Sequence, residues 1–109
     1  MTLAKERRRS VRVVCTESVE GVALNPGILF RGKMRDLSET GCYVVTRAVV
    51  QLEPGHVIEL RFKIGKVEQR TLARVVQIMP PMGIRMEFVQ TGQGFSKLFR
   101  GFCHTQSLS

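Results

Sequence analysis

Hydrophobic and polar residues alternate along most of this chain, which is the pattern of β-strands that bury one face. The alternation is unbroken over residues 58–64 and recurs over residues 84–88. Residues 28–37 alternate in the same way, with basic side chains on one predicted face. Other segments are less regular but rich in β-branched residues, which favour strands. The predicted strands span residues 11–16, 28–37, 42–46, 58–64, 67–79 and 84–88.

Turn-forming residues separate the predicted strands at intervals of roughly 8–12 residues, a spacing typical of small antiparallel barrels and sandwiches. Proline presets one backbone angle and glycine accepts a positive φ, so clusters of these residues predict chain reversals. Because closing a sheet removes its exposed edges, we predict a mainly all-β domain, a six-stranded antiparallel β-barrel. The predicted strand ends and turns lie at Glu17-Ser18, Asn25-Pro26-Gly27, Pro54-Gly55, Gly65-Lys66 and Pro80-Pro81.

The hydrophobic period changes near the C-terminus, from that of a strand to that of an amphipathic α-helix. Apolar side chains there recur at i, i+3, i+4 and i+7, with polar side chains on the other side. Gly101 weakens this C-terminal helix by roughly 1 kcal/mol relative to alanine. We expect the apolar stripe to cover an open end of the barrel; the alternative is an interface with a partner. The stripe consists of Phe95, Leu98, Phe99 and Phe102.

Positive charge is concentrated at the N-terminus. The 109-residue chain carries 17 Lys and Arg against 9 Asp and Glu, a formal net charge of +8. Half of that excess lies in residues 1–12, which suits a partner that bears phosphate. The alternative is a solvated tail without a specific ligand. The chain is therefore divided into a flexible basic arm (1–12), a barrel (13–90) and a C-terminal helix and tail (91–109).

The composition also disfavours several classes of protein. No apolar run approaches the roughly 20 residues of a membrane helix, and the first residues lack the apolar stretch of a signal peptide. Cys15, Cys42 and Cys103 form no CxxC pair, so we expect reduced thiols in a cytoplasmic protein without membrane insertion. His56 and His104 add no ligand spacing, so we expect no metal site.

Candidate catalytic groups are sparse as well. A nucleophile needs a base within hydrogen-bond reach. Cys103 and His104 are neighbours, but adjacent residues of a helix point about 100° apart and do not face each other. A Gly-rich phosphate loop is also missing from the sequence. We therefore predict that the protein is not an enzyme and has no catalytic residues.

Two short motifs point instead to ligand binding. Arg8-x-x-x-Arg12 lies in the basic arm, and Asp36-x-Ser38-x-x-Gly41 ends the long strand with the basic face. Each is weak alone, since arginine pairs recur in basic arms and Asp, Ser and Gly are ordinary turn residues. Together, in this order on a six-strand pattern, they resemble the PilZ domain family, which binds the bacterial second messenger cyclic di-GMP. The resemblance covers nearly the whole chain and implies a six-stranded barrel with a C-terminal helix.

The resemblance also implies which residues bind cyclic di-GMP. Arg8 and Arg12 would hold guanine and phosphate from the arm, because the arginine fork matches both groups. Asp36, Ser38 and Gly41 would form the barrel side of the site, with Gly41 providing space for the ligand or for a backbone turn that no side chain would tolerate.

Two neighbouring positions refine this prediction. Arg7 directly precedes the arginine motif, and family members with a basic residue there tend to take an intercalated ligand dimer. Arg7 is therefore included in the site, and we favour two ligands per chain. Cys42 stands where many members have a second glycine, and its small side chain still permits close approach.

We predict a stand-alone bacterial receptor that binds cyclic di-GMP, needs no other cofactor and signals through an unidentified downstream protein. The arm would wrap the nucleotide and change the surface offered to that protein. One alternative is a protein–protein adaptor of the same fold that does not bind nucleotide. A less favoured alternative is a basic nucleic-acid-binding barrel. The aromatic content of 6% argues against it, because single-strand platforms stack bases on aromatic rings, and no specific nucleic acid is expected.

Overall fold

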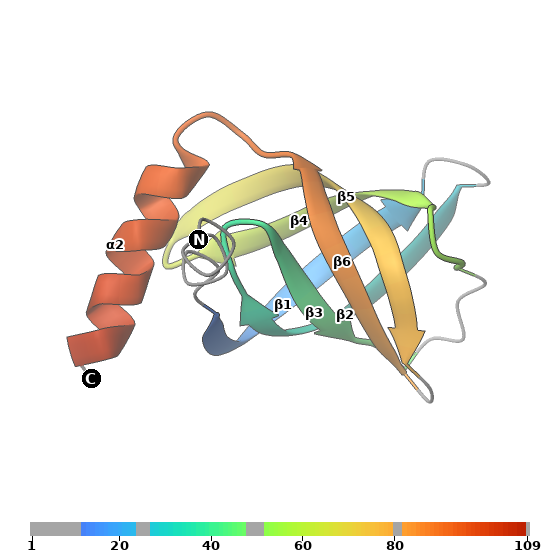
Figure 1. Ribbon diagram of the computed structural model, residues 1–109, viewed down its shortest axis with the longest axis horizontal. Helices are drawn as coiled ribbons and strands as arrows, with labels where there is room; N and C mark the ends of the chain where they lie inside the picture. The colour runs from blue at the N-terminus through green and yellow to red at the C-terminus, as the bar shows by residue number, and fades with distance from the viewer. Residues whose placement is uncertain (1–11, 24–26, 48–51, 80–81, 109) are drawn as a thin grey trace, which may run out of the picture.

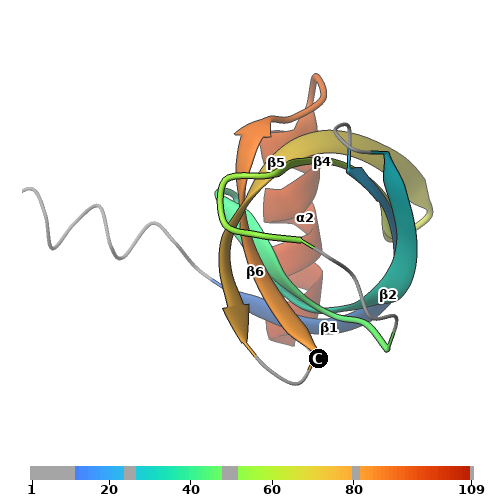
Figure 2. The ribbon, with the colours of Figure 1, turned by 90° about the vertical axis from the view of Figure 1, so that its right-hand side faces the viewer.

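The computed structural model describes residues 12–23, 27–47, 52–79 and 82–108, with side chains described as far as Cys103. Six strands form a closed antiparallel barrel in the order β1-β2-β3-β6-β5-β4, and one helix, α2, lies across one end of it (Figures 1 and 2). This confirms the predicted fold class. The elements are β1 (Val13–Ala23), β2 (Ile28–Leu37), β3 (Gly41–Val45), β4 (Val57–Ile64), β5 (Val67–Met79), β6 (Gly83–Gln90) and α2 (Phe95–Leu108).

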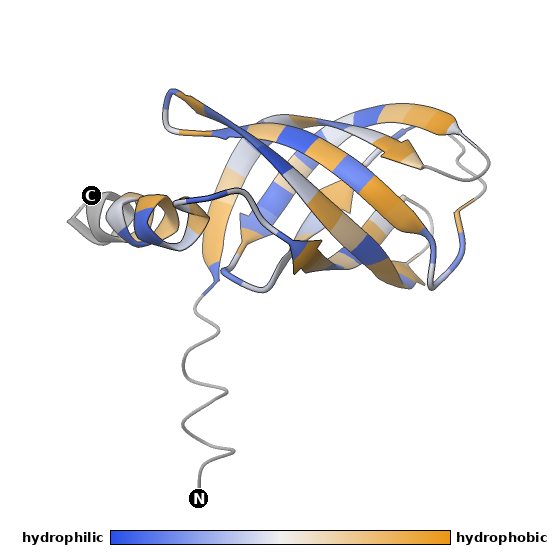
Figure 3. Ribbon diagram, turned by 90° about the horizontal axis from the view of Figure 1, so that it is seen from above, coloured by the Kyte–Doolittle hydropathy of each residue, from blue (hydrophilic) through white to orange (hydrophobic). Residues whose placement is uncertain are grey.

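The alternation along the strands separates the barrel interior from its outer surface. Hydrophobic and hydrophilic bands alternate along the ribbons in Figure 3. Met34, Ile58 and Leu60 are fully buried in the core, while the basic residues Arg31 and Lys33 of β2 are exposed. Burial of the apolar face drives the strands together, because each buried aliphatic side chain contributes about 1.5–3 kcal/mol.

The first strand is longer than predicted. Glu17 and Ser18 were expected to end it, but β1 continues through them to Ala23. The pairing with β2 shifts register between Val14 and Glu17 and then resumes, so the backbone hydrogen bonds of the polar residues are satisfied by the neighbouring strand. The second half of β1 also pairs with β4 on its other side, which closes the barrel.

Three glycines adopt the backbone conformation that the turn predictions require. Gly27, Gly55 and Gly65 have φ values of 89°, 99° and 63°, in the left-handed region that side chains other than glycine rarely adopt. Residues 24–26 and the Pro80-Pro81 pair lie outside the described residues.

Helix α2 closes its end of the barrel with the predicted apolar stripe. Phe95 and Phe99 are 1% and 3% exposed, and Leu98 and Phe102 are half-buried. The Phe95 ring meets the Phe88 ring of β6 edge-on, with 5.4 Å between centroids. Such aromatic pairs add about 0.5–1.5 kcal/mol beyond area burial, so these contacts fasten the helix to the barrel.

The three cysteines are free thiols, and they differ in burial. Cys42 is fully buried in β3, and this burial raises the pKa of its thiol above the ordinary value. Burial also raises the pKa of Cys15 and Cys103. Because only the thiolate reacts readily, the fully buried Cys42 has the character of a packing residue.

Candidate ligand-binding site

The two sequence motifs meet where β1 begins and β2 ends. Val13 pairs with Leu37 and Val14 with Asp36, so the residue just before β1 lies beside the end of β2. Arg12 Nη1 donates a hydrogen bond to Asp36 Oδ1 at 3.2 Å. The Arg12 side chain is 47% exposed and the Asp36 side chain 20%, so the guanidinium keeps donors facing solvent. The pairing orients Asp36 and holds the end of the basic arm against the barrel.

Ser38 organises the turn between β2 and β3. Its side chain is buried, and Ser38 Oγ accepts hydrogen bonds from the backbone amides of Thr40 at 3.2 Å and Gly41 at 3.1 Å. The Ser38 amide donates to the Gly41 carbonyl at 2.8 Å. These are the local hydrogen bonds by which serine stabilises turns. The described contacts of the Ser38 hydroxyl therefore lie inside the turn, directly after Asp36 and Leu37.

Gly41 is required by the close approach of two strands. It pairs with Glu87 of β6, and a Cβ at this position would collide with the backbone carbonyl oxygen of Met86 and lie 3.1 Å from Glu87 Cα. Its φ is not positive, so the position excludes a side chain through lack of space and not through a left-handed backbone. The physical reason for glycine is backbone-to-backbone contact, which lets β6 pass directly beside the motif.

A row of outward-facing side chains extends the site across the barrel. Register pairs Asp36 with Tyr43 of β3, and Tyr43 with Arg85 of β6. The Arg85 guanidinium carbon lies 5.3 Å from the centroid of the Tyr43 ring, and both residues are half-buried. Val14, which is 80% exposed, lies opposite Asp36 on the other side. The row therefore combines a carboxylate, an aromatic ring and two guanidinium groups, those of Arg12 and Arg85.

Sequence reasoning did not select Tyr43 or Arg85. Alternation alone places both on outward faces, which they share with most polar residues of the barrel. Their proximity to Asp36 depends on the strand order β2-β3-β6, and β6 is separated from β3 by two other strands along the chain. No local motif marks such a cross-strand neighbour.

Two further ion pairs flank the row. Arg74 Nη1 of β5 lies 2.8 Å from Glu87 Oε2, so its charge is already paired next to Gly41. Glu39 Oε2, in the motif turn, lies 3.7 Å from Arg100 Nε of α2. The second pair connects the motif turn directly to the C-terminal helix.

Two of the predicted site residues are not described by the structure. Arg7 and Arg8 fall outside the described residues. On the basic face of β2, Arg31 pairs with Glu20 at 3.3 Å and Lys33 Nζ donates to Ser18 Oγ at 3.2 Å, so both point toward β1. Within the described part of the chain, no group of three or more His, Cys, Asp or Glu side chains could hold a metal ion. The described helix is not long and apolar enough to cross a membrane.

The chain is thus a small closed barrel that carries an arginine–aspartate pair where β1 begins and β2 ends. The sequence matches the family model of the PilZ domain over residues 6–102. The chain belongs to the PilZ domain family, a family of cyclic di-GMP receptor and adaptor domains. No protein with a curated description matches the sequence.

Solved structures show the same fold. The Bacillus subtilis inhibitor of motility MotI (DgrA) superposes with a TM-score of 0.80 at 19% identity, over 94% of this chain and 52% of that chain. This chain therefore spans about half the length of MotI. The PilZ domain of CeSA from a cellulose-synthesizing bacterium superposes with a TM-score of 0.70 at 20% identity, over 88% of this chain and 98% of that chain. The PilZ domain of Escherichia coli YcgR with c-di-GMP superposes with a TM-score of 0.65 at 14% identity, over 92% of this chain and 88% of that chain.

Proposed function

We propose that this PilZ domain is a receptor for cyclic di-GMP that signals through a protein partner in a bacterial cytoplasm. The observation that carries the proposal is the pairing of Arg12 with Asp36, because it joins the arginine motif and the aspartate motif on one surface. The three free thiols fit a reducing compartment. Arg7 and Arg8 would complete the site from the arm, and no other cofactor is needed.

The chemistry of the paired residues suits a cyclic dinucleotide. The exposed donors of Arg12 can fork onto a phosphate or onto the O6 and N7 edge of guanine. Asp36 accepts hydrogen bonds, so it can receive them from the N–H edge of guanine while it remains beside Arg12. The Tyr43 ring and the Arg85 guanidinium add a flat, cationic surface on which a base can stack.

Ligand binding would act by ordering the arm. An arginine-rich segment that folds over a nucleotide loses conformational entropy when it binds, and the contacts to phosphate and base offset that cost. The ordered arm then presents a new surface beside the barrel. A partner protein with a higher affinity for the ligand-bound form than for the ligand-free form would then bind preferentially when cyclic di-GMP is present.

Calorimetric titration with cyclic di-GMP at physiological salt tests the proposal, with GTP as the control nucleotide. We expect saturable binding that is selective for the dinucleotide. A stoichiometry of two ligands per chain is expected from Arg7, since an intercalated dimer brings a second nucleotide to the same surface. Absence of binding by a folded protein would contradict the receptor function and favour the adaptor alternative, and a partner would then bind without nucleotide.

Replacing Arg85 with alanine tests whether the outward row belongs to the site. We expect the affinity for cyclic di-GMP to fall by about three- to tenfold, the range expected for loss of a partly exposed cation at a stacking surface. Arg61→Ala is the matched control, because Arg61 is an exposed arginine on β4, outside the row. Equal affinities of the Arg85 and Arg61 variants would confine the site to the arm, Asp36 and the motif turn.

A further inference from the structure

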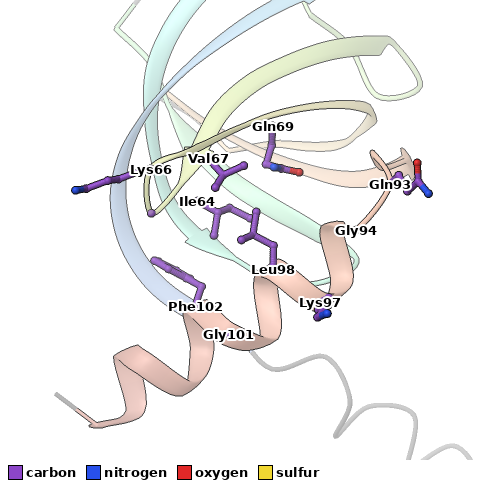
Figure 4. A pocket seen from close by; sticks show the side chains of 11 residues that line it. Ile64, Lys66, Val67, Gln69, Gln93, Gly94, Lys97, Leu98, Gly101 and Phe102 are labelled. Atoms are coloured by element: carbon purple, nitrogen blue, oxygen red, sulfur yellow. The ribbon is translucent and has the colours of Figure 1, made fainter.

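An apolar groove lies beside α2, and neither Glu39 nor Arg100 is among the residues that line it. It runs between the helix and the turn that joins β4 to β5, with a volume of about 860 Å³ (Figure 4). Ile64 and Val67 of the hairpin and Leu98 and Phe102 of the helix form its apolar lining, and in Figure 4 these side chains point toward one another. Val67 is 48% exposed, so the groove leaves apolar surface in contact with water.

A glycine opens this groove from the helix side. Gly101 lies between Leu98 and Phe102 in the lining, and a Cβ placed there would meet no atom within 4 Å. Its φ is not positive, so neither the backbone conformation nor the packing of the barrel requires glycine. Glycine inside a helix costs about 1 kcal/mol relative to alanine. The missing side chain leaves a notch in the wall of the groove between Leu98 and Phe102.

The charge around the groove is of one sign. Lys66 of the hairpin turn and Lys97 of α2 line it, and the lining described for the groove contains no acidic residue. The ion pairs found among the described side chains do not involve either lysine. An occupant with apolar side chains and neighbouring carboxylates would therefore complement both the apolar lining and the two lysines of the groove.

We propose that this groove binds an acidic amphipathic helix of a partner protein. Leu98 and Phe102 of α2, which are one helical turn apart, both line the groove. An amphipathic partner helix presents apolar side chains at the same spacing, so its side chains can pack against both residues. Gly101 lets the axis of that helix approach α2 closely, as small residues do where two helices pack. The groove is separate from Arg12 and Asp36, so partner docking does not require the ligand site itself.

Fluorescence anisotropy with the full chain tests the proposal. The probe is a labelled synthetic peptide of about four helical turns, with leucines at i, i+3, i+4 and i+7 and glutamates elsewhere. We expect saturable binding that Gly101→Leu weakens by at least about tenfold, because the leucine fills the notch. Ser96→Leu, which adds the same side chain at an exposed position outside the lining, is expected to leave the affinity unchanged.

Charge reversal provides the second arm of the test. The double variant Lys66→Glu, Lys97→Glu is expected to have a lower affinity for the acidic peptide. Arg61→Glu, which changes a residue outside the groove, is expected to leave that affinity unchanged. The proposal is overturned if the acidic peptide does not bind, if a version with lysines in place of glutamates binds equally well, or if Gly101→Leu has no effect. Titration of Gly101→Leu with cyclic di-GMP separates the two sites, since this variant is expected to bind nucleotide like the parent.

Discussion

Replacing Arg12 with alanine is expected to weaken cyclic di-GMP binding by about ten- to a hundredfold while the barrel stays folded. Arg12 is the described member of the arginine motif, and its Nη1 lies 3.2 Å from Asp36 Oδ1. The variant loses the charged hydrogen bonds to the ligand and also releases the arm from the barrel. The free energy of unfolding should change by less than about 1 kcal/mol, because ion pairs this exposed contribute little to stability.

Calorimetry of three variants separates geometry from charge in this effect. Arg12→Lys keeps the positive charge but loses the planar fork, so it should bind nearly as weakly as Arg12→Ala. Arg31→Ala removes another exposed, ion-paired arginine from the basic face of β2 and should bind like the parent. Parent affinity in Arg12→Lys would show that Arg12 acts only as a point charge, and parent affinity in Arg12→Ala would remove it from the site.

Replacing Phe95 with alanine is expected to lower the free energy of unfolding by about 3–5 kcal/mol, as large-to-small changes of buried aromatic residues do. Phe95 is 1% exposed and contacts the rings of both Phe88 and Phe99. The substitution removes the central contact between α2 and the barrel. A loss of this size is a large fraction of the about 5–15 kcal/mol that stabilises a typical domain.

Denaturant unfolding followed by circular dichroism measures this loss. Phe95→Leu keeps an apolar side chain in the same place, so its free energy of unfolding should fall by less. This variant keeps the experiment informative if the alanine variant does not fold. Phe102→Ala is the matched control in the same stripe, and its loss should also be smaller because Phe102 is only half-buried. Equal losses at the two phenylalanine positions would contradict the described packing of α2.

Much of the fold follows from local sequence. Alternation, β-branched residues and turn signals together predict six strands, because the period of two distinguishes a buried face from an exposed one. Gly27, Gly55 and Gly65 predict reversals because only glycine adopts their backbone angles at no steric cost. The spacing of Phe95 and Phe99 predicts which side of the helix is buried. Each of these predictions depends only on residues that are close to one another in the sequence.

The candidate site is only partly predictable in this way. The sequence motifs identify Arg12, Asp36 and Gly41 without describing how they act. Gly41 was assigned to the ligand or to a turn, whereas its contact with the backbone of Met86 comes from a strand more than forty residues away. Likewise, the continuation of β1 through Glu17 depends on partners in β2 that the local polarity does not reveal.

The sequence by itself therefore determined the number of strands, the glycine turns, the amphipathic helix and the two motifs of this PilZ domain. The tertiary structure alone decided the closure of β1 onto β4, the row from Asp36 through Tyr43 to Arg85, and the groove beside Gly101. The reason is that strands pair through backbone groups that every residue type except proline shares, so side-chain identity specifies a partner only weakly. Which side chains become neighbours is settled when the whole barrel buries its apolar faces together.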